Sequence, residues 1–180
     1  MSSALPFDLS DNETYKPLRR SSTEFMHSGG VGFVSVSDGI TAISGWAAAY
    51  TPRYSMTTSK YSAIGVSAPT LFALSYSSFE GMSGVIDLPL MVEYSLGYGS
   101  TDRADSKDFG MFFGAGAGIT LISGGYGYGG TFSNWNIAAG ARMEFRDQPV
   151  DLRLSYGKGF GDWSSVNKFT LGLTYILTYT

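Results

Sequence analysis

From residue 24 onward, hydrophobic and polar residues alternate one by one along most of the chain. In residues 166–180 bulky apolar residues fill every second position, and small or polar residues fill the positions between. The bulky set is Phe169, Leu171, Leu173, Tyr175, Leu177 and Tyr179. Only in an extended strand do successive side chains point to opposite sides. A strand with one bulky apolar face and one small or polar face is typical of a wall between lipid and a narrow polar lumen.

Seven further runs with this alternation precede the last one. The eight runs span residues 24–36, 40–51, 63–76, 86–98, 109–122, 134–145, 150–157 and 166–180. Residues 52–60 are predicted to form a polar connection, and Pro69 predicts a kink or bulge in the third run. An even number of hairpin-joined strands closes first to last and leaves no unpaired edge in hydrocarbon. The predicted fold class is therefore all-β, an eight-stranded antiparallel up-and-down transmembrane β-barrel over residues 23–180.

A soluble, lipocalin-like barrel is the alternative, with its apolar faces pointing inward. Two features favour the membrane barrel. The polar faces carry too few charges for a wall exposed to water, and the apolar faces end in aromatic residues, as at the interfacial girdles of membrane barrels. The expected girdle residues are Tyr94, Tyr98, Trp135, Phe145, Tyr156, Tyr175 and Tyr179.

The composition indicates that much of the protein surface is not in contact with water. Charged residues make up 15% of the chain, against about 25% in a typical soluble domain. The net charge of −3 provides no basic surface for nucleic acid, and the absence of Cys excludes disulfides and thiolate metal sites. Residues 109–141 carry no charge, but Gly at alternate positions argues against a transmembrane helix there.

Residues 1–22 are polar and show no period, which predicts a flexible N-terminal tail. The other interpretation is a segment that docks on a partner or plugs the lumen. The two ends of an even-stranded barrel lie on one side, and we expect that side to be the periplasm. The N-terminus has no apolar signal-peptide core, so for an exported protein we expect the signal to have been removed.

The predicted inward faces carry a set of charges of both signs. We predict a lumen ion network formed by Glu93, Arg142, Glu144, Asp151, Arg153 and Asp87. Residues 142–153 flank one tight reversal, so antiparallel pairing places their charges within one or two rungs of each other. Because matched charges with several hydrogen bonds can offset their desolvation, we interpret the network as a plug of the channel.

Residues 86–94, Ile-Asp-Leu-Pro-Leu-Met-Val-Glu-Tyr, resemble a strand signature of the porin-family small outer-membrane β-barrels of Bacteroidetes, which are similar to OmpA and OmpX. Residues 113–118, Phe-Gly-Ala-Gly-Ala-Gly, resemble the glycine-rich strand that follows in that family. The last strand resembles the signal read by the barrel-assembly machinery, although Tyr179 is penultimate here rather than final. The resemblance implies the fold and a bacterial outer-membrane location, but no specific activity.

Enzymatic chemistry has little support in the sequence. Some small outer-membrane barrels modify lipid A with a His, a Ser and a carboxylate. The single histidine here, His27, is next to Ser28, but neighbouring strand residues face opposite ways and cannot form an acid–base pair. We expect no enzyme activity, no cofactor and no metal site.

Two function classes remain. The first is a structural or interaction protein whose loops or tail bind a partner, and the second is a narrow pore for ions or small solutes. The expected partners are outer-membrane lipid and lipopolysaccharide, and a protein of a larger complex, but no nucleic acid. Aromatic residues in Gly-rich loops are the partner-binding candidates. They are Tyr126, Tyr128, Phe160 and Trp163.

Overall fold

The computed structural model describes residues 23–77, 81–100, 109–124, 129–146 and 148–179 of the 180-residue chain. The described part is almost entirely β-strand. Its strands are β1 (Thr23–Ser37), β2 (Ala42–Ser59), β3 (Ser62–Ser67), β4 (Thr70–Ser77), β5 (Gly81–Gly97), β6 (Gly110–Ser123), β7 (Gly129–Phe145), β8 (Gln148–Gly159) and β9 (Asn167–Tyr179). A short 3₁₀ turn, η2 (Gly161–Trp163), precedes β9. No helix in these ranges is long and apolar enough to cross a membrane.

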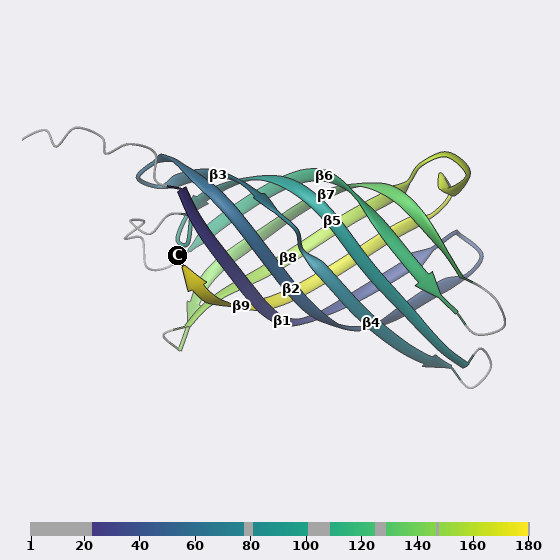
Figure 1. Cartoon of the computed structure of the whole chain (residues 1–180). Helices are drawn as coiled ribbons and strands as arrows, with labels where there is room; N and C mark the ends of the chain where they lie inside the picture. Colours follow the sequence, from purple (N-terminus) through teal and green to yellow (C-terminus); the bar gives the residue numbers. More distant parts are fainter. Residues whose placement is uncertain (1–22, 78–80, 101–108, 125–128, 147, 180) are drawn as a thin grey trace, which may run out of the picture.

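The strands form one closed antiparallel barrel (Figure 1). The first strand pairs with the last, Val31 opposite Leu173, and also with β2, Val31 opposite Ala48. β3 and β4 both lie between β2 and β5, so together they occupy one position and the nine strands make an eight-membered ring. The break between them falls at Ala68 and Pro69, where the Ala68 N–H donates to the Pro52 carbonyl oxygen at 3.0 Å. The structure thus confirms the kink predicted at Pro69.

The barrel has two distinct ends. At the terminal end β1 begins and β9 ends (Figure 1). The β2–β3, β5–β6 and β7–β8 connections lie at this end, and the β1–β2, β4–β5, β6–β7 and β8–β9 connections lie at the opposite, far end. Residues 1–22, for which a tail is predicted, lie outside the described residues.

Alternation sets which side chains face out. On β5, Leu90 is 61% exposed and the next residue, Met91, is 1% exposed. The same apolar-out pattern runs around the ring. It includes Trp46, Phe72, Leu74, Leu88, Val92, Phe113, Ile137, Leu154, Leu171 and Leu177. An exposed apolar belt of this kind needs lipid as its solvent, which contradicts the lipocalin-like alternative.

Aromatic residues gather toward both ends of the outer surface. Trp46 packs edge-to-face on Phe33 with ring centroids 5.9 Å apart, and Trp135 does so on Tyr156 at 5.7 Å, both toward the far end. Tyr94, Phe145 and Tyr175 are exposed toward the terminal end. Rings at these two levels fit the two interfaces of a bilayer.

One predicted connection is wrong. Residues 52–60 were expected to form a polar loop, but β2 runs through Ser59. Arg53 and Ser55 are buried in the lumen, and Tyr54 and Met56 are exposed outside, so the period of two continues. The polar composition belongs to the inner face of a strand and not to a loop.

The far-end turn between β1 and β2 is held by its own acidic residue. The Asp38 carboxylate accepts hydrogen bonds from the N–H groups of Ile40 and Thr41 at 2.9 and 2.7 Å, and Gly39 has φ of +94°. The hydrogen bond from Thr41, followed by that from Ile40, lowers the pKa of Asp38 below the ordinary value of 3.8. This turn therefore needs both the Asx geometry and the glycine.

The orientation of the wall can be tested at Leu90. Replacing it with Arg places a charge near the middle of the lipid-facing surface, which costs about 2–4 kcal/mol in a membrane barrel. We expect L90R to lose this much unfolding free energy, measured by reversible denaturation in phospholipid vesicles. Ile40→Arg is the matched control, because Ile40 lies in a turn and is 94% exposed. Equal effects of the two changes would contradict the assignment.

Candidate functional site: the filled lumen

The inward faces of β3, β5 and β8 join in one buried ion pair toward the terminal end. The Glu93 carboxylate Oε1 accepts from the Ser67 hydroxyl at 2.5 Å and lies 2.6 Å from Nη1 of Arg153. Glu93 and Arg153 stand on β5 and β8, which are not neighbours in the sheet, so the pair crosses the lumen. Both side chains are buried. The structure therefore brings together two residues of the predicted network.

A second pair lies in the same region. Arg142 and Asp151 are directly opposite each other on β7 and β8, with Nε 3.1 Å from Oδ2. Arg142 Nη1 also donates to the carbonyl oxygen of Gly99 at 3.0 Å, which ties the β5–β6 connection to the lumen. These contacts place Arg142 and Asp151 inside the barrel, as the sequence predicts.

An aromatic ring links the two arginines. The guanidinium carbons of Arg142 and Arg153 lie 4.8 and 4.5 Å from the ring centroid of Phe112 on β6. The ring lies over Gly140 of β7, where an added Cβ would come within 2.2 Å of it. Gly140 thus provides the space that lets one ring face two cations. Phe112 interrupts the row of glycines on the inner face of its strand, and that interruption is the sequence signal for its role.

Arg53 is a further member that sequence reasoning missed. It projects into the same layer from β2, opposite Ser67, and interacts electrostatically with Arg142, Glu93, Asp151 and Arg153. It is buried, and among the described residues its Nε and Nη1 atoms have no hydrogen-bond partner. The sequence predicts a loop over residues 52–60, and that prediction gives Arg53 no place on an inward face.

Asp87 belongs to a separate cluster, further toward the far end. Its carboxylate pairs with Nζ of Lys168 at 2.5 Å and accepts from the Thr120 hydroxyl at 2.8 Å. Asn134 donates to the same hydroxyl at 2.7 Å, and Asn136 in turn donates to Asn134. Lys168 was not among the predicted network residues, although it stands on the polar face of the last strand.

Glu144 corrects the predicted network. It was expected beside Arg142, but it is exposed at the terminal end, opposite Pro149. Burial raises the pKa of Tyr98 at this end, and the nearby charge of Glu144 raises it further. Glu144 follows the alternation of β7, but it lies so near the strand end that its carboxylate reaches water.

The far half of the lumen contains an apolar cluster next to the Asp87–Lys168 pair, which corrects the expectation of a polar lumen throughout. The buried cluster consists of Val34, Val36, Ala47, Ala49, Leu71, Ala73, Val85, Phe132 and Val166. Trp163 from the β8–β9 connection stacks on Phe132 with ring centroids 5.5 Å apart. The indole of Trp163 therefore lies against the apolar cluster at this end of the barrel.

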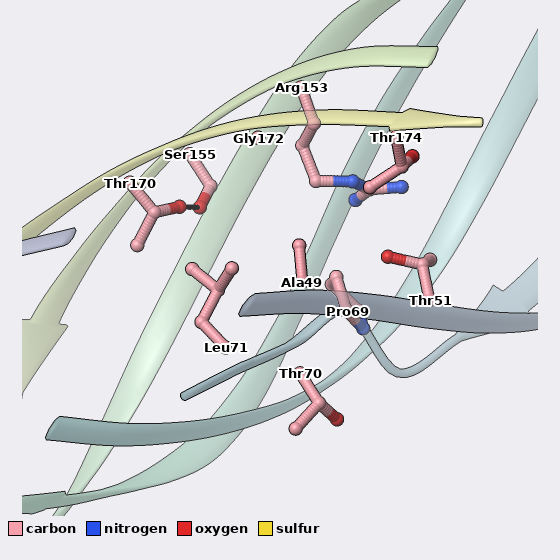
Figure 2. Close-up of a pocket in the computed structure, with 10 residues that line it drawn as sticks. All are labelled: Ala49, Thr51, Pro69, Thr70, Leu71, Arg153, Ser155, Thr170, Gly172 and Thr174. Carbon is pink, nitrogen blue, oxygen red and sulfur yellow. Dashed lines mark hydrogen bonds between the residues drawn. The ribbon is translucent and has the colours of Figure 1, made fainter. Parts of the chain in front are cut away.

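A small cavity separates the apolar cluster from the charged layer (Figure 2). The charged layer consists of Arg53, Glu93, Arg142, Asp151 and Arg153. Its volume is about 20 Å³, and Leu71 and Ala49 line it together with Arg153. The hydroxyls of Ser155 and Thr170 are hydrogen-bonded to each other at its edge. A space of this size holds about one water-sized particle.

The sequence matches no protein-family model and none of the curated proteins. The structure, however, is similar to solved barrels. Ail, the attachment invasion locus protein of Yersinia pestis, is 14% identical, with 87% of this chain and 99% of that chain covered and a TM-score of 0.55. Neisserial surface protein A (NspA) is 10% identical, with coverage of 87% and 97% and a TM-score of 0.58. The outer membrane enzyme PagL is 13% identical, with coverage of 87% and 99% and a TM-score of 0.42.

This likeness shows the fold. The chain is an eight-stranded transmembrane β-barrel of the up-and-down kind.

The barrel places its single histidine outside. His27 stacks on Phe25, and its Nδ1 lies 3.5 Å from the Tyr50 hydroxyl. Ser28 points into the lumen and accepts a hydrogen bond from the Thr174 hydroxyl at 3.1 Å. The structure confirms that His27 and Ser28 face opposite ways. That the barrel is not an enzyme stays a prediction.

The aromatic loop candidates separate into three cases. Phe160 is 50% exposed at the far end of the barrel. Trp163 is 38% exposed, but its stacking on Phe132 gives it a structural role as well. Tyr126 and Tyr128 lie outside the described residues.

Glu93 and Glu144 allow a matched test of the charged layer. Glu93→Ala leaves Arg153 buried without its carboxylate, and breaking a buried pair costs about 3–5 kcal/mol. We expect E93A to lower the unfolding free energy by this amount in detergent or vesicles. Glu144→Ala removes the same side chain at an exposed position and should change it little. A similar loss in both variants would contradict the central place of Glu93.

Proposed function

We propose that this protein is an integral outer-membrane protein of the bacterial envelope that acts as a structural or interaction protein. Its lumen is closed, and its far-end loops bind a partner. The observation that carries the proposal is the filling of the barrel: a charged layer toward the terminal end and an apolar cluster beneath Trp163 toward the far end. A barrel filled with side chains serves as an anchor more readily than as a channel.

The location follows from the outer wall. The exposed apolar belt with aromatic residues toward both ends requires a bilayer, and closed barrels of this kind are typical of bacterial outer membranes. The resemblance of residues 86–94 to the Bacteroidetes-type porin family supports the same location. The surrounding partners are then outer-membrane lipid and lipopolysaccharide, and the terminal end faces the periplasm.

The alternative is a narrow pore for ions or small solutes. Unpartnered buried polar atoms favour it, because they mark places in the terminal half of the lumen where the packing is incomplete. Besides those of Arg53, they include Nη2 of Arg142 and Oδ1 of Asp151. An ion passing through would still have to cross the apolar cluster that lies toward the far end.

A conductance measurement distinguishes the closed structural barrel from the narrow pore. We expect the purified protein in a planar lipid bilayer to give no large, steady conductance, because the apolar cluster blocks continuous water. A general porin in the same bilayer serves as the positive control. Reproducible, steady current steps from the wild-type barrel would overturn the closed lumen.

A substitution at Phe160 tests whether the far-end loops bind a partner. Isolation from native membranes in mild detergent should bring a protein partner along with the barrel, and Phe160→Ser should reduce its recovery several-fold. Phe145→Ser is the matched control, because Phe145 is 53% exposed at the opposite end and should leave recovery unchanged. Equal losses in both variants, or no partner with the wild type, would contradict binding through the far-end loops.

A further inference from the structure

The buried charges of the lumen do not balance. Among the described residues, the buried cations are Arg53, Arg142, Arg153 and Lys168, and the buried anions are Asp87, Glu93 and Asp151. Within the described ranges, four buried positive charges against three buried negative ones leave an excess of one positive charge. Arginine does not release its proton in a protein, so this excess cannot be removed by titration of a guanidinium group.

The excess lies in the terminal-end layer. Lys168 is paired with Asp87, Arg153 with Glu93 and Arg142 with Asp151. Arg53 has no ion pair among the described residues, although it interacts with the charges of both pairs in its layer. Burying an unpaired charge costs free energy, so one more negative group in this layer would stabilise the folded barrel.

Unused hydrogen-bond donors of the same layer indicate what kind of group is missing. Besides the two nitrogens of Arg53, Nη2 of Arg142 and both Nη atoms of Arg153 lack a hydrogen-bond partner in the described part of the chain. Nη1 of Arg153 lies within ion-pair distance of Glu93, so Nη2 is the nitrogen of that group left free for a further ligand. The unpartnered acceptors of this layer are Oε2 of Glu93 and Oδ1 of Asp151, which are fewer than its unpartnered donors. Donors that exceed the acceptors available to them favour an acceptor-only ligand.

The cavity beside Arg153 has the position and the size for such a ligand. Arg153 is buried and projects into it (Figure 2). Thr51 and Thr174 add hydroxyl groups to its lining, and Thr51 stands two residues from Arg53 on the inward face of β2. At about 20 Å³ the cavity exceeds the roughly 10–15 Å³ that one water needs, and it is too small for an organic acid.

We propose that one small monovalent inorganic anion, of the chloride class, binds in this cavity between Arg153 and the threonine hydroxyls and neutralises the excess charge of Arg53. The anion completes the charged layer and is a structural ligand of the barrel. The proposal does not depend on whether the lumen conducts, because the tests below measure occupancy and stability.

Crystals of the wild-type protein grown in sodium bromide provide the direct test, since bromide replaces chloride and scatters anomalously. We expect an anomalous peak in the cavity, within hydrogen-bond distance of Arg153. A cavity without a peak, or one occupied by water alone, would overturn the proposal.

The solution test compares melting temperatures in sodium chloride and sodium gluconate at equal ionic strength. Gluconate is too large for the cavity, while screening of surface charge is the same in both salts. Because a ligand of the folded state stabilises it by mass action, the wild-type melting temperature should rise as chloride replaces gluconate. An identical melting temperature in both salts would count against the anion.

Variants assign the effect to the cavity. Arg53→Gln should abolish the rise with chloride, and Thr51→Val, which keeps the side-chain shape, should weaken it. Arg146→Gln removes the same charge at an exposed turn and should preserve the full rise. If R53Q folds poorly, the effect of chloride on the melting temperature of T51V decides whether the anion binds in the cavity. A full rise in T51V, or its loss in R146Q, would place the anion elsewhere and refute the site.

Discussion

A strand in hydrocarbon must satisfy every backbone N–H and C=O with another strand, and the rest of this structure depends on that requirement. Each unpaired group would cost several kcal/mol in the absence of water. The pairing of β1 with β9 removes the last two edges. Once the ring is closed, the period of two places each strand side chain either against lipid or in the lumen. This placement decides which charged groups can meet inside the barrel.

Eight strands leave an interior that side chains can fill. In this protein the filling is divided. The Glu93–Arg153 pair lies in the terminal half, and the far half holds the apolar cluster around Phe132 together with the Asp87–Lys168 pair. Charged pairs fix one arrangement because each is tied to particular partners, and the apolar cluster excludes water without such partners.

Small residues give the larger groups their space. Phe112 reaches two arginines only because Gly140 has no side chain beneath the ring. Trp163 likewise covers the far end at a place where Gly130 leaves room for the indole. Glycine lowers the stability of an isolated strand, but here it allows contacts that a Cβ would block.

The sequence by itself determined the barrel, its strand alternation and the lipid-facing side, because a period of two and an apolar outer face are properties of each strand separately. It also predicted inward positions for Glu93, Arg142, Asp151, Arg153 and Asp87. Antiparallel pairing across the tight turn also predicted that Arg142 and Asp151 lie close together. Only the tertiary structure decided the Glu93–Arg153 and Asp87–Lys168 pairs, since these join strands that are not neighbours. The polar composition of residues 52–60 predicts a loop, and this hides the inward position of Arg53 on β2. The alternation also does not show depth along the barrel, so it places Glu144 in the lumen although the residue is exposed. Facing inward is a local property of the strand, whereas burial and pairing depend on where the closed ring places each residue along its axis.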